Sequence, residues 1–78
     1  MYQIYVIPAQ TCYIGESLVA AKNVRAANGL IRAFKDSDPY NQFDSFGYGF
    51  VDEEDAIEGS MCDRDGIIHH GIRYHPCI

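Results

Sequence analysis

The 78-residue chain lacks a long apolar run, and its first residues do not have the pattern of a membrane-targeting leader. No apolar stretch approaches the roughly 20 residues that a membrane-spanning helix needs. The first residues have strand-like character, without the basic start and small-residue cleavage site of a secretory signal. We therefore expect a soluble, cytoplasmic protein with no membrane partner. At this length there is room for a single domain, residues 1–78.

Cysteine is scarce and its spacing is wide. The three cysteines, Cys12, Cys62 and Cys77, are an odd number and match no small disulfide scaffold. Free thiols in a reducing compartment fit this usage. A Cys62–Cys77 bridge across a terminal hairpin is the geometrically conceivable alternative.

Motifs of enzymes and metal sites are also missing. The chain has no G-x-S-x-G, Walker, dinucleotide-binding or H-E-x-x-H pattern, so we predict no catalytic residues, no enzyme and no cofactor. Zinc prefers thiol and imidazole ligands, but the spacing of these groups gives no two matching pairs, and we predict no metal site. A small zinc-binding protein remains an alternative function, with these groups as its candidates: Cys62, His69, His70, His75 and Cys77.

Basic residues are few, and the two signs of charge are segregated. Lysine and arginine total 6 against 11 acidic residues, which gives a formal charge of −5. This balance argues against direct nucleic-acid binding, because phosphate binding draws on basic side chains. A basic protein surface is the more natural partner. Four of the basic residues fall on one predicted helix and share a face: Lys22, Arg25, Arg32 and Lys35.

Hydrophobic periodicity predicts a strand at 2–7 and a helix from Leu18 to about Lys35. Ser17 is the predicted N-cap, and Asp36 to Pro39 ends the helix because the residue before proline resists helical dihedrals. Apolar residues recur every three or four positions along this helix and form its core stripe: Leu18, Ala21, Val24, Ala27, Ile31 and Phe34.

The second half of the chain predicts further strands. One runs from Phe43 or Ser45 to Val51, and 54–61 forms a turn or short helix capped by Asp52, or else the return strand of a hairpin. Asp63 to Gly66 is a turn signal before a last strand at 67–75. The predicted fold is α+β: a small antiparallel sheet with one long amphipathic helix packed on one face, in β-α-β-β order. Ile4 and Val6 are expected to face the helix.

An aromatic-glycine run stands out in the predicted second strand. On a strand its three rings point to one side, and they either enter the core or pave the uncovered sheet face, where they would form a binding patch. The rings are those of Phe46, Tyr48 and Phe50.

The run Gly47-Tyr48-Gly49-Phe50-Val51 resembles the centre of the longer ribonucleoprotein signature of RNA-recognition motif domains. Ile4-Tyr5-Val6 resembles the shorter signature. Membership would imply a single-stranded RNA-binding module whose sheet aromatics, here Tyr5, Tyr48 and Phe50, stack on bases. The chain departs from the family at Phe46 and Glu53, where the signature has a basic residue and an aromatic one, and the second helix would be a stub.

Carboxylates are dense between positions 44 and 65. This acidic run is either a solvated surface or a patch that imitates a phosphate backbone and docks on a basic groove, where arginine pairs with carboxylate. Its candidate partner-binding residues are Asp52, Glu53, Glu54, Asp55 and Glu58. The basic helix face is likewise either solvated, with some side chains paired to the chain's own carboxylates, or a contact for an acidic partner or a second copy in a homodimer.

In length, acidity and predicted element order the chain resembles the small inhibitor proteins that phages and other mobile elements carry, the anti-CRISPR proteins among them. The resemblance implies a binding protein in the host cytoplasm. Its partner would be a host protein or ribonucleoprotein complex, and the acidic and aromatic face would occlude that partner's nucleic-acid-binding surface.

Overall fold

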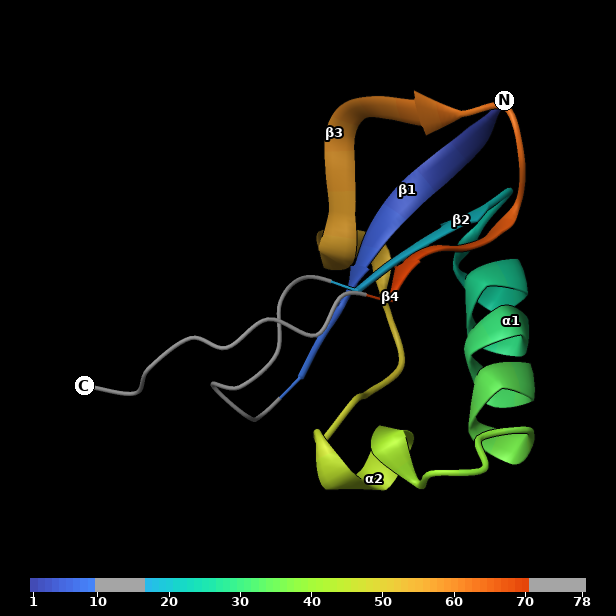
Figure 1. Ribbon diagram of the computed structural model, residues 1–78. Helices are drawn as coiled ribbons and strands as arrows, with labels where there is room; N and C mark the ends of the chain where they lie inside the picture. Colours follow the sequence, from blue (N-terminus) through green and yellow to red (C-terminus); the bar gives the residue numbers. More distant parts are fainter. Residues whose placement is uncertain (10–16, 71–78) are drawn as a thin grey trace.

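A four-stranded antiparallel sheet carries helix α1 on one face (Figure 1). The computed structural model describes residues 1–9 and 17–70, and the strands lie in the order β3-β1-β2-β4. The elements in chain order are β1 (Tyr2–Ile7), β2 (Ser17–Ala21), α1 (Val24–Asp36), α2 (Gln42–Ser45), the 3-10 turn η1 (Glu53–Asp55), β3 (Ala56–Cys62) and β4 (Gly66–His70). The α+β class is confirmed, whereas the predicted β-α-β-β order is wrong.

The main error lies in residues 17–21, which form strand β2 instead of the first turns of the helix. β2 pairs with β1 from Ile7↔Ser17 to Gln3↔Ala21, and its other edge pairs with β4. Leu18 and Ala21 are three residues apart, a spacing that also suits a helix. Pairing of both edges of β2 with neighbouring strands favours the extended conformation instead, because strand preference depends on these neighbours. Lys22 consequently precedes the helix.

Helix α1 begins after Asn23, whose side-chain Oδ1 accepts a hydrogen bond from the Ala26 N–H at 2.8 Å. This is an N-cap bond, which satisfies a backbone donor that has no partner inside the helix. The helix ends at Asp36, as predicted, and the Ser37 N–H donates back to the Ala33 carbonyl. Its inward stripe, predicted correctly from Val24 onward, buries Ala27 and Ile31.

The predicted strand at 43–51 is wrong. Gln42–Ser45 is the short helix α2, and residues 46–52 form an irregular segment that returns along α1 to η1. Asn41 and Gly47, which flank α2, have positive φ angles of 53° and 67°, outside the range of regular strand geometry. The Phe43 N–H donates to Asp38 Oδ2 at 2.7 Å, so the loop before α2 also favours the helical turn.

The core lies between the sheet, α1 and α2. From β1 it takes Tyr5 and Ile7, while Ile4 and Val6 are half-buried, so the predicted inward set is wrong. Both alternating sets of β1 contain large apolar side chains, and the choice between them depends on pairing with β2 and β3. From β4, Ile67 packs against this cluster.

The end of the chain follows the predicted turn. Gly66 has φ 117° at the start of β4, as the turn signal requires. The described part of β4 stops at His70, so the rest of the predicted strand at 67–75 lies outside the described residues.

Candidate binding surface

The turn η1 holds the predicted acidic run in a defined conformation. Asp52 Oδ1 accepts from the Glu54 N–H, and Asp55 Oδ2 accepts from the Asp52 N–H, both at 2.9 Å. This reciprocal capping box confirms Asp52 as the cap. The two aspartates are therefore engaged in folding the turn. Glu53 and Glu54 are exposed and make no such bond within the described residues.

Asn28 fixes the acidic turn beside α1. Its Nδ2 donates to the Val51 carbonyl at 3.0 Å, and its Oδ1 accepts from the Val51 N–H at 2.8 Å. Val51 is only 4% exposed, so this amide pair replaces the water that its backbone would otherwise bind. The sequence analysis missed Asn28; its place at the edge of the inward stripe, between Val24 and Ile31, is the signal that was available.

The outer face of α1 carries a basic stripe, defined here as Arg25, Arg32 and Lys35. All three are exposed, and Lys22 is exposed just before the helix. The Arg32 guanidinium lies 5.4 Å from the centre of the Phe50 ring, and Lys35 Nζ lies 5.4 Å from that of Phe43. In the described part of the chain, none of the stripe's cations forms an ion pair with a carboxylate. The alternative of pairing with the chain's own carboxylates is thus not seen for these three residues within the ranges 1–9 and 17–70.

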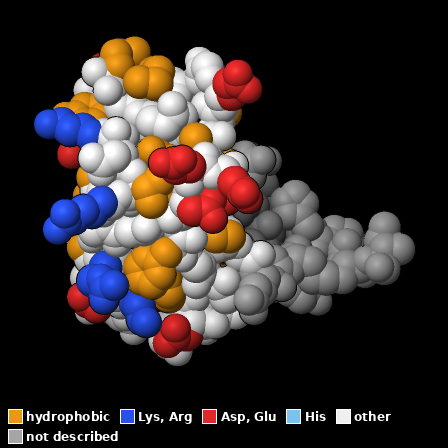
Figure 2. Space-filling view, turned by 180° about the vertical axis from the view of Figure 1, so that it is seen from behind, with side chains coloured by type: hydrophobic (Ala, Val, Ile, Leu, Met, Phe, Trp, Pro, Cys, Tyr) orange, Lys and Arg blue, Asp and Glu red, His pale blue; other side chains and the backbone are white. Residues whose placement is uncertain are grey.

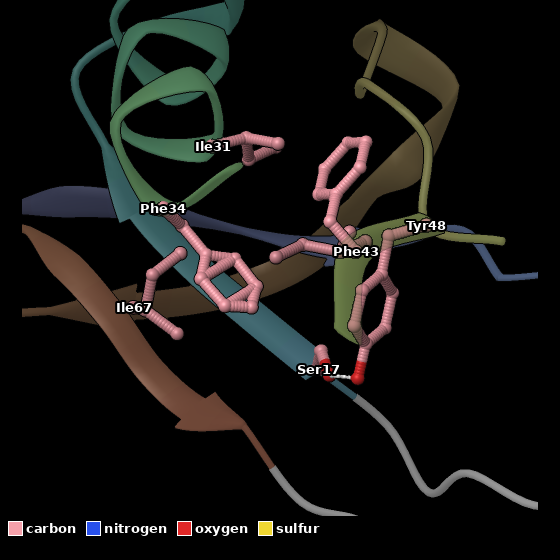
Figure 3. A pocket seen from close by; sticks show the side chains of 7 residues that line it. Ser17, Ile31, Phe34, Phe43, Tyr48 and Ile67 are labelled. Carbon is pink, nitrogen blue, oxygen red and sulfur yellow. Dashed lines mark hydrogen bonds between the residues drawn. The ribbon is translucent and has the colours of Figure 1, made fainter. Parts of the chain in front are cut away.

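The aromatic run does not form a row of exposed rings. Tyr48 is 6% exposed, Phe46 is half-buried against the core, and only Phe50, at 41%, is exposed. The hydroxyl of Ser17 donates to Tyr48 Oη at 3.0 Å (Figure 3), and Phe34 and Phe43 flank the Tyr48 ring at 6.0–6.1 Å. The ring of Tyr48 is therefore not exposed to a partner, and Phe46 is half-buried.

This placement also contradicts the stacking surface that the RNA-recognition resemblance implied. Residues 47–51 belong to no strand, and Tyr5, at 5% exposure, lies in the core. No pair of sheet aromatics is therefore available from these positions for bases to stack on.

The space around Tyr48 does not form a small-molecule site. Between the sheet, α1 and α2 the side chains leave a volume of about 0 Å³ that a water molecule could occupy. Small-molecule pockets occupy about 300–1,000 Å³. Apart from the Ser17–Tyr48 pair, the lining is apolar: Ile7, Ile31, Phe34, Phe43 and Ile67 (Figure 3).

The candidate zinc ligands lie mostly outside what the structure describes. Within the described ranges, no three His, Cys, Asp or Glu side chains are grouped closely enough to hold a metal ion. Cys62 is a half-buried free thiol. His75 and Cys77 fall in the segment after residue 70, which is not described, and the side chains of His69 and His70 are not described either.

No family model, curated protein or solved structure matches the chain. Among the described residues, no helix has the length and apolar character to span a bilayer.

Proposed function

We propose that the protein is a non-enzymatic binding protein that docks its acidic turn on a basic surface of a host protein or ribonucleoprotein complex. The docking residues are Glu53 and Glu54 of η1 and Glu58 of β3. Occlusion of that surface would keep the complex from engaging nucleic acid, the mode of action of an anti-CRISPR-like inhibitor from a phage or another mobile element. Its place of action is the host cytoplasm.

The observation that carries this proposal is the fixed presentation of exposed carboxylates. The capping box holds η1, and the Asn28–Val51 pair fastens it to α1. A preorganised acidic turn loses less conformational freedom on binding than a flexible acidic loop does. Arginine pairs with carboxylate and with phosphate in the same two-pronged geometry, so such a turn competes for a basic groove that binds nucleic acid.

The test compares two charge-reversed variants that have the same net charge. In the first, Glu53, Glu54 and Glu58 become lysine, which leaves Asp52 and Asp55 to fold the turn. Each variant and the wild type are used to capture proteins from a host lysate, with and without nuclease, and captured proteins are identified by mass spectrometry.

The control variant reverses Asp44, Asp63 and Asp65, which are equally exposed but lie away from η1. We expect the control to retain a nuclease-resistant partner that the first variant loses, and the purified partner to bind nucleic acid less well when the wild type is added. Equal capture by both variants would rule out docking through the acidic turn.

A further inference from the structure

Positive, apolar and negative groups lie in adjacent bands on one face of the molecule. Figure 2 shows a column of Lys and Arg side chains along one side of this face and a group of Asp and Glu side chains next to it. Hydrophobic side chains lie between them. We call this the banded face and define it by the basic stripe, the exposed ring of Phe50, and Glu53 and Glu54.

Two contacts establish that the bands are neighbours in space. Arg32 lies over the Phe50 ring, and Asn28, one turn earlier in α1, bonds to the backbone of Val51. Residues 50 to 52 therefore run along the helix toward its N-terminus and bring η1 alongside. Because the stripe forms no ion pair within the described chain, both charges remain available to another molecule.

We propose that the banded face binds a second copy of this chain around a two-fold axis near Phe50. Rotation by 180° about that axis reverses the order of the bands. The basic stripe of each copy then faces the acidic turn of the other, while the two Phe50 rings meet at the centre. A two-fold interface needs a self-complementary patch, and a patch with positive and negative halves meets this requirement.

Phe50 is an exposed large hydrophobic side chain. In the dimer it contacts its symmetry mate, and burial of its ring adds an apolar contribution to the charge pairs. The net charge of −5 on each copy opposes association at long range. Each exposed ion pair adds little to the stability of the complex, because water and salt screen it. The dimer is accordingly weak and reversible, and it forms at high protein concentration.

The proposal is tested with two complementary double variants. Arg25→Glu with Arg32→Glu leaves Lys35 as the one cation of the banded face and makes the face predominantly acidic, and Glu53→Lys with Glu54→Lys makes it entirely basic. Sedimentation velocity is measured for the wild type, for each variant, and for their equimolar mixture over a range of concentrations. Circular dichroism confirms that each variant is folded.

We expect the wild type to form a dimer and each variant alone to dimerise at least about tenfold more weakly, since four ion pairs across the axis become repulsive. The mixture is expected to recover a 1:1 heterodimer. A wild type that stays monomeric up to about 1 mM overturns the proposal, as does a mixture that stays monomeric while the wild type dimerises. Growth beyond a dimer overturns the two-fold geometry.

The inference stands apart from the proposed inhibitory function, although both use the acidic turn. The Arg25→Glu, Arg32→Glu variant keeps η1 intact and is expected to capture the same host partner as the wild type. A dimer without partner capture would contradict only the proposed function, and partner capture by a strictly monomeric wild type would contradict only the dimer.

Discussion

At the residue scale, Asn28 makes the contact on which the candidate surface depends. Asn28→Ala removes both bonds to Val51 and leaves a buried backbone N–H and carbonyl without partners. We expect the free energy of unfolding to fall by about 2 kcal/mol, because a buried polar group that loses its partner bears the full desolvation penalty. Urea denaturation measures the change. Arg25→Ala, on the exposed side of the same helix, is the control and should stay within about 0.5 kcal/mol of the wild type.

The Ser17–Tyr48 hydrogen bond permits a second prediction. Ser17 is 1% exposed, so its hydroxyl depends on a partner inside the protein. Tyr48→Phe and Ser17→Ala should each lower the free energy of unfolding by about 1–2 kcal/mol, and the double variant should cost less than their sum. A double-mutant cycle in urea measures the coupling between the two hydroxyls. Strict additivity would show that the bond contributes nothing to stability.

Local sequence could assign some side chains and not others. Asp52 was identifiable as a cap because its capping hydrogen bonds join residues no more than three positions apart in the chain. The inward set of β1 was not identifiable, because Ile4 and Tyr5 are both apolar and the choice between them depends on distant pairing. The burial of Tyr48 and the exposure of Phe50 could not be predicted either. Both residues lie in an irregular segment, which has no periodic pattern from which burial can be inferred.

At the scale of elements, glycine allows the backbone to be tested at two sites with the same substitution. Gly29→Ala should raise the free energy of unfolding by about 0.5–1 kcal/mol, because Gly29 lies inside α1 and a methyl group there meets nothing within 4 Å. Gly59 has equally open surroundings but a φ of 78° in β3. Gly59→Ala should therefore lower stability by about 1–2 kcal/mol. Thermal and urea unfolding would compare the two, and a shared sign would contradict the conformational explanation.

The elements that the sequence predicted well are those determined by local contacts. The strand at 2–7, the helix from Val24 to Asp36 and the turn before Gly66 depend on nearby caps, periodicity and turn residues. β2 is different, because its alanine-rich sequence suits a helix and becomes a strand only between β1 and β4. β3 was predicted only as an alternative to a turn or short helix. Its pairing with β1 is irregular, because the register shifts between Gln3 and Tyr5.

At the scale of the whole molecule, the sequence pointed to an α+β fold and to segregated charge, but not to where the two charges meet. The basic stripe and the acidic run were predicted as separate features. Their side-by-side arrangement depends on residues 46–52 folding back along α1, which a strand at 43–51 would not have produced. The long-range packing of an irregular segment was therefore the information that the sequence did not supply.

Shared use of the acidic turn predicts competition between the second copy and the host partner. At a total concentration ten times the dimer dissociation constant, about a fifth of the chains are monomeric, so the apparent affinity for the partner is about fivefold weaker than the intrinsic one. Arg25→Ala with Arg32→Ala weakens the dimer and leaves η1 unchanged. At that concentration we expect this variant to bind the captured partner about fivefold more tightly than the wild type does, as measured by titration.

A matched control separates this effect from a simple change in net charge. Lys22→Ala with Arg64→Ala removes the same two charges from exposed positions outside the basic stripe. It should bind the partner as the wild type does, because the banded face and hence the dimer are unchanged. Equal affinities for all three proteins, under conditions where the wild type is dimeric, would show that the acidic turn is accessible in the dimer. In that case the second copy and the host partner would bind different surfaces. One of the two proposals would then be wrong, because both assign Glu53 and Glu54 to the bound surface.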